Sequence, residues 1–83
     1  MLKFTTASGS VYFVKEEEQM FARQSDQVLF NKNTGEDDTH KHLEFKSYVE
    51  YGLNEWGNLV FEFIEDGTIG VIRSTPVVDA ELI

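Results

Sequence analysis

Two kinds of side chain that bind divalent metals lie in one short polar segment. Asp37 and Asp38 are followed by His40 and His42. In an extended chain the two histidines point to the same side, so two imidazoles and a carboxylate could contact one ion. Structural zinc sites need four ligands and catalytic ones usually three, and Lys41 adds a positive charge between the histidines. We therefore predict no metal site and no cofactor.

The sequence offers no pair of residues arranged for acid–base or nucleophilic catalysis. Glu62 is the one carboxylate flanked by core-forming residues, but strand alternation places it on the face opposite Phe61 and Phe63, toward solvent. The Ser8-Gly9-Ser10 sequence lacks the strand–turn–helix surroundings of a nucleophile elbow and is too short to cradle a phosphate, so we interpret it as a turn. The sequence predicts a protein that is not an enzyme.

Acidic residues form the most distinctive chemical pattern. Seven Lys and Arg stand against fifteen Asp and Glu, which gives a net charge of 7 − 15 = −8. Residues 1–43 hold five basic and seven acidic side chains (−2), and residues 44–83 hold two basic and eight acidic ones (−6). This charge opposes direct binding to nucleic acid and to anionic membranes, and it favours a basic protein partner. The alternative is that the acidic excess only aids solubility.

Carboxylates on neighbouring strands of a sheet are spaced at regular intervals and can imitate phosphates. Such a face could occupy a groove lined by Lys and Arg in a protein that binds DNA or RNA, and long-range attraction would raise the association rate. The residues predicted to bind this partner are Glu44, Glu50, Glu55, Glu62, Glu65 and Asp66, with Asp79 and Glu81 beside predicted strands as well.

Two other partners are kept as alternatives. A small anionic ligand such as a nucleotide could be held by Arg23 and Arg73 while Tyr12 stacks on its base, although core packing would account for most of the aromatic residues. A structural or assembly protein would instead form homo-oligomers through its edge strands.

The elements that must position these residues are predicted to be strands. Asp66-Gly67 joins two aromatic and β-branched runs and suits a two-residue type I′ turn. Alternating residues predict a first hairpin over 2–6 and 11–14, a third strand over 20–23, a fourth over 27–30, and the hairpin strands over 59–64 and 68–72.

Three further segments complete the predicted fold. Residues 31–39 are dense in turn formers and predict an exposed loop. Residues 43–56 fit both a strand and a helical stripe, and we favour strand, with a helix over 16–24 or 43–56 as the alternative. Pro76 should interrupt the chain, so that residues 77–83 form a separate edge or terminal strand. The prediction is one all-β domain over residues 1–83, a small antiparallel barrel or sandwich of about seven short strands.

The cysteine count and the apolar runs bear on location. The chain has no Cys, which excludes disulfides, thiolate metal sites and cysteine nucleophiles. Residues 1–6 lack the apolar stretch of a signal peptide, and no apolar run approaches the roughly 20 residues of a membrane-spanning helix. We expect a soluble, cytoplasmic protein.

The two ends of the chain resemble a group of phage proteins. Residues 5–12, Thr-Thr-Ala-Ser-Gly-Ser-Val-Tyr, and residues 74–78, Ser-Thr-Pro-Val-Val, are similar to the ends of small β-rich phage and prophage proteins. The resemblance implies a role in the cytoplasm of a host cell as an inhibitor that binds a host factor, including nucleic-acid-handling defence machinery. It carries over no catalytic residue.

Overall fold

The computed structural model describes the backbone of residues 1–83 and the side chains of all residues except Asp26, Gln27, Val28, Leu29, Asn31, Asp38 and His40. No helix occurs in this described backbone, so neither helical alternative is realised. Nine strands are present: β1 (Leu2–Thr6), β2 (Val11–Lys15), β3 (Met20–Arg23), β4 (Ser25–Asn31), β5 (Glu36–His42), β6 (Lys46–Ser47), β7 (Glu50–Leu53), β8 (Asn58–Glu65) and β9 (Thr68–Leu82). The all-β prediction is confirmed.

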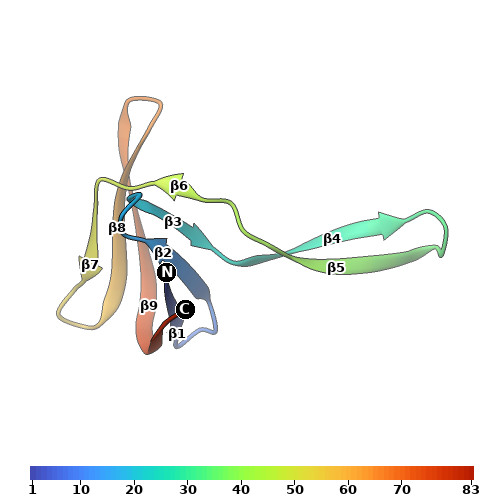
Figure 1. Ribbon diagram of the computed structural model, residues 1–83, viewed down its shortest axis with the longest axis horizontal. Coiled ribbons are helices and arrows are strands. Elements are labelled where there is room, and N and C mark those ends of the chain that lie inside the picture. The colour runs from blue at the N-terminus through green and yellow to red at the C-terminus, as the bar shows by residue number, and fades with distance from the viewer.

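Seven of these strands form one antiparallel sheet in the order β6-β3-β2-β1-β9-β8-β7, which curls strongly into a half-barrel (Figure 1). The chain between the edge strands β6 and β7 bridges the two sides of the curl. The Tyr48 N–H donates to the Gln19 carbonyl at 2.9 Å, and the Val49 N–H donates to the Glu62 carbonyl at 2.7 Å. Residues 43–56 therefore contain two short strands, and the two residues between them join the two edges of the sheet.

The core occupies the inner face of this curled sheet. Phe61 is fully buried, and its ring stacks on the ring of Phe21 with centroids 4.1 Å apart and on that of Tyr51 at 5.5 Å. Tyr12 and Tyr48 complete the ring cluster around it. Because these rings come from β2, β3, β7, β8 and the β6–β7 connection, their packing holds the sheet in its curl.

The hairpin of β8 and β9 has the predicted turn. Glu65 lies opposite Thr68, so the loop contains only Asp66 and Gly67. Both have positive φ, 52° for Asp66 and 75° for Gly67, as a type I′ turn requires. This turn sets the register of the two strands, and thus which residues share a face.

The prediction that Pro76 separates residues 77–83 into their own strand is wrong. β9 is continuous, but it pairs with β8 up to Pro76 and with β1 from Val77 onward, and both ladders shift register near this point. The Ser74 Oγ there accepts the Leu59 N–H at 3.0 Å. Since the strand exchanges one partner for the other at Pro76, the missing N–H of proline interrupts neither ladder.

The strands β4 and β5 form a separate two-stranded arm that projects from the half-barrel (Figure 1). The predicted strand over 27–30 lies within β4 and is confirmed. The predicted loop over 31–39 is too long, because β5 begins at Glu36 and only residues 32–35 turn the chain. Polar residues 36–39 can form a strand here because pairing with β4 satisfies their backbone hydrogen bonds.

Candidate acidic binding surface

Two predicted partner-binding carboxylates meet on the outer face of the half-barrel. Phe61 and Phe63 turn toward the core, so Glu62 between them faces outward and is exposed, as predicted. Glu50 on β7 lies directly opposite Glu62 and is also exposed. Like charges directly opposite each other across a sheet lower the stability of the fold. The sheet register therefore creates a local concentration of negative charge at an energetic cost.

Apolar side chains continue this face beside the two carboxylates. Val71 on β9 lies opposite Glu62, and Ile64 lies opposite Ile69 one step toward the turn. All three are largely exposed, at 62% for Val71, 63% for Ile64 and 70% for Ile69. An apolar strip next to paired carboxylates is a surface on which a partner can bury area as well as neutralise charge. We call these five residues the acidic hairpin surface.

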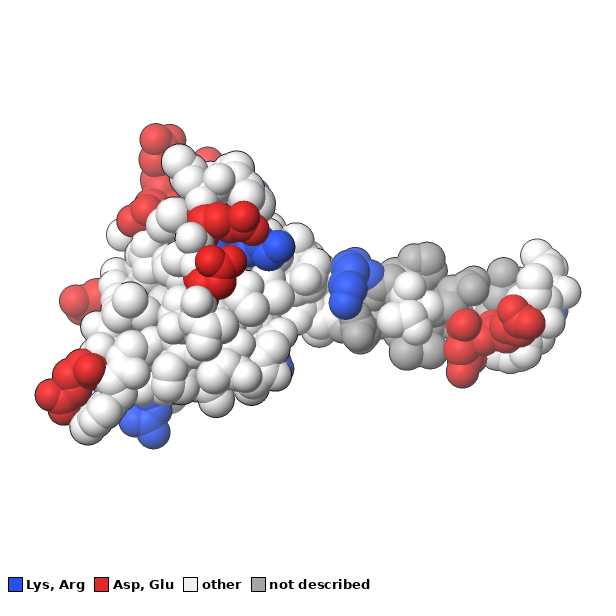
Figure 2. Space-filling model, turned by 90° about the horizontal axis from the view of Figure 1, so that it is seen from below, with Lys and Arg blue, Asp and Glu red and all other residues white. Residues whose placement is uncertain are grey.

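The other predicted acidic residues lie elsewhere. Glu65 and Asp66 stand at the turn of the same hairpin, with Glu65 on the opposite face from Glu62 by alternation. Glu55 lies in the connection at the other end of β8. Glu44 lies between β5 and β6, with its Oε2 3.9 Å from the Nε2 of His42. Figure 2 shows the result: acidic side chains are spread over the body and the outer end of the arm, and basic ones are fewer.

Glu81 is already engaged within the chain. Its Oε1 lies 3.4 Å from the Nζ of Lys3, its cross-strand neighbour on β1. Asp79 lies opposite Thr5 on the same pair of strands and faces solvent. These two carboxylates therefore belong to the β1–β9 half of the sheet, where an internal cation balances one of them.

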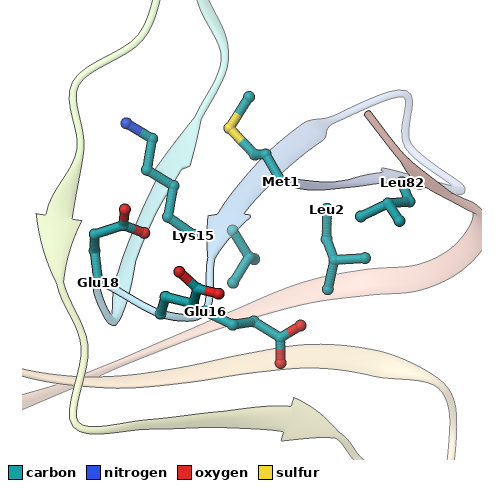
Figure 3. Close-up of a pocket in the computed structure, with 8 residues that line it drawn as sticks. Met1, Leu2, Lys15, Glu16, Glu18 and Leu82 are labelled. Atoms are coloured by element: carbon teal, nitrogen blue, oxygen red, sulfur yellow. The ribbon is translucent and has the colours of Figure 1, made fainter.

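The sequence interpretation missed a second acidic feature, the loop Glu16-Glu17-Glu18 between β2 and β3. It borders an open hollow of about 430 Å³. Figure 3 shows the carboxylates of Glu16 and Glu18 on one side of this hollow and the apolar Leu2 and Leu82 on the other. Three consecutive glutamates between two strand patterns were the available signal, but they also fit a solvated turn.

Glu16 is tied to β7 through Tyr51. Burial raises the pKa of Tyr51 to about 12, and a hydrogen bond to the Glu16 carboxylate adds to the shift. Burial, and then the charge of Glu16, also raise the pKa of Tyr48. Both phenols keep their protons at neutral pH, so Tyr51 donates to Glu16 and holds the acidic loop against the edge of the half-barrel.

The three residues predicted to hold an anionic ligand do not form one pocket. The Tyr12 ring is buried and stacks on Phe61 at 5.9 Å, so it is part of the core. Arg23 is the cross-strand neighbour of Tyr12, and its Nη2 donates to the Ser10 Oγ at 3.2 Å. Arg73 faces outward from β9 opposite Val60, on the other side of the sheet. Arg23 borders a hollow of about 380 Å³, together with Ser8, Ser10 and Lys41.

The histidine segment considered for metal binding falls partly outside the described side chains, since Asp38 and His40 are not among them. Among the side chains that are described, no group of three or more His, Asp and Glu residues could hold a metal ion. The prediction about this segment stays a prediction.

The described structure offers no helix that is long and apolar enough to cross a membrane.

Comparisons with known proteins add no family to this description. No family model, curated protein or solved structure matches the chain.

Proposed function

We propose that this chain is a binding protein, not an enzyme, and that the acidic hairpin surface engages a basic partner protein. The observation that carries the proposal is the exposed cross-strand pair Glu50 and Glu62. The repulsion between them costs stability in the free protein, and a cationic side chain placed between them would remove it. Binding a basic partner therefore relieves an unfavourable feature of the fold.

The apolar strip defines how such a partner would bind. The aliphatic part of a Lys or Arg side chain can lie on Val71 or Ile69 while its charged end reaches the carboxylate of Glu62. The net charge of −8 would steer the encounter and raise the association rate at low salt. A groove that normally binds nucleic acid is lined by Lys and Arg side chains, which could make both the charged and the aliphatic contacts.

The host-cell role that we propose for the protein rests on residues 5–12 and 74–78. Their resemblance to small phage and prophage proteins supports an inhibitor that acts in the host cytoplasm on a nucleic-acid-binding or defence protein. Occupying the basic groove would exclude the nucleic acid from it. The chain itself would not bind nucleic acid or an anionic membrane, because its charge has the same sign as theirs.

The test compares two double variants that remove the same number of charges. A short oligolysine peptide serves as the basic probe, and calorimetry measures its affinity at low and high salt. Glu50→Gln with Glu62→Gln should weaken binding several-fold, because each exposed ion pair contributes up to about 1 kcal/mol. Glu44→Gln with Glu55→Gln should have a smaller effect, since these residues lie outside the surface. Equal losses in both variants, or binding that does not weaken with salt, would contradict the proposal.

A second candidate function, the binding of a small anion, is favoured by the hollow beside Arg23. Arg23 and Lys41 line it with the hydroxyls of Ser8 and Ser10, and no carboxylate borders it among the described residues. Thermal unfolding with inorganic phosphate and a panel of nucleotides tests it. A rise in melting temperature that Arg23→Gln abolishes would support this function, and no shift with any anion would exclude it.

A further inference from the structure

One edge of β9 is left unpaired over residues 68–73. β8 occupies one side of this segment, from Glu65 opposite Thr68 to Val60 opposite Arg73. On the other side β1 pairs with β9 only from Val77 onward. No other strand in the described backbone pairs with β9. The outer half of the β8–β9 hairpin thus extends past the end of β1, as Figure 1 shows.

The turn determines which backbone groups lie on this free edge. In a two-residue hairpin the residues that flank the turn, here Glu65 and Thr68, exchange both hydrogen bonds. Hydrogen-bonded and non-hydrogen-bonded pairs then alternate along the strand. Gly70 and Ile72 consequently bond toward β8, and the N–H and C=O groups of Ile69, Val71 and Arg73 point outward from the free edge.

The free edge lacks the features that usually prevent pairing. Natural edges are protected by charged residues, prolines or bulges. Residues 68–73 contain no proline and no acidic residue, and Arg73 at their end is their single charge. Ile69 and Val71 are exposed and have high strand propensity. In a chain with a net charge of −8, an edge without carboxylates is a place where a second copy can approach without strong repulsion.

We propose that two copies of this chain pair through this edge, antiparallel, with the two-fold axis at Val71. Val71 then lies opposite Val71 of the second copy, and Ile69 lies opposite Arg73 in both directions. Each of these residue pairs would exchange two backbone hydrogen bonds, so every outward group of the edge is satisfied. An axis at Arg73 would bring two guanidinium groups together, and an axis at Ile69 would leave Arg73 unpaired.

The pairing would extend the acidic hairpin surface across both copies. Glu62 neighbours Val71 in each copy, so two Glu50–Glu62 pairs would flank a central pair of valines on one face. At about 4.8 Å between strands, the two Glu62 residues would stand about 14 Å apart. The dimer does not depend on the proposed function, because it is formed by the backbone edge and not by the carboxylates.

Disulfide trapping tests the register directly, since the chain contains no native cysteine. Residues opposite each other in a hydrogen-bonded pair have Cα atoms about 5.5 Å apart, which is within the range that a disulfide spans. On mild oxidation Val71→Cys should form a covalent dimer of twice 9.5 kDa. Val78→Cys is the matched control, because Val78 is a similarly exposed valine (66%) in the other half of β9. Faster trapping of Val78→Cys would overturn the proposed edge.

Light scattering of the native chain gives the second measurement. A dimer mass that persists at high salt is expected, with Val71→Lys shifted to the monomer and Val78→Lys unchanged. Circular dichroism of Val71→Lys separates loss of pairing from loss of the fold. A monomer at every concentration, or a dimer that Val71→Lys leaves intact, would overturn the inference. Neither result bears on oligolysine binding, so failure of the dimer and failure of the proposed function remain distinguishable.

Discussion

Replacing Glu62 with Gln should stabilise the free protein while weakening its binding to a basic partner. Glu62 lies directly opposite Glu50, and both side chains are exposed to water. Two unit charges about 6 Å apart in water repel by about 0.7 kcal/mol, within the range of about 0.2–1 kcal/mol for cross-strand pairs. In a domain of this size about 1 kcal/mol corresponds to about 4–8 °C, so the melting temperature should rise by about 3–5 °C.

Thermal unfolding followed by circular dichroism at two salt concentrations checks this prediction. The screening length falls from about 30 Å at 0.01 M salt to about 3 Å at 1 M, so the gain should be present at low salt and nearly absent at high salt. Glu65→Gln is the control: it removes the same charge, but Glu65 faces Thr68 and not a carboxylate. A lower melting temperature for Glu62→Gln, or a gain equal to that of Glu65→Gln, would show that repulsion between Glu50 and Glu62 does not destabilise the fold.

Three further substitutions test the packing beneath this surface. Phe61→Ala should lose about 3–5 kcal/mol in denaturant unfolding, because a fully buried ring at the centre of the core is removed. Gly70→Ala should cost about 1–3 kcal/mol by the same assay, because a Cβ there would meet the Phe63 ring at 2.5 Å and force it to move. In Tyr51→Phe, stability should fall less steeply between pH 10 and 12. In the native chain the raised pKa of about 12 makes ionisation of this phenol cost stability as pH rises through that window. A retained steep loss would show that Tyr51 does not cause it.

The local features of this protein follow from its amino-acid sequence alone. Asp66-Gly67 specifies a type I′ turn because both positions need positive φ, and the alternation of residues 59–65 follows from the two-residue repeat of a strand. The exposure of Glu62 could be predicted for the same reason. These features depend only on neighbours in the chain, so composition and spacing were sufficient for the β8–β9 turn and for the all-β class, but not for β5 or for the full length of β9.

Which distant residues lie side by side depends on the pairing of the strands in three dimensions. Glu50 and Glu62 are separated by a connection whose length sets the β7–β8 register, and a shift by one residue would have placed Glu50 opposite an inward-facing position. Pro76 is tolerated because β9 changes partners there, which no local pattern reveals. Arg23 and Arg73 look equivalent in the sequence, yet they lie on opposite faces of the sheet. Pairing between strands is a long-range property, and it determines both the acidic hairpin surface and the free edge beside it.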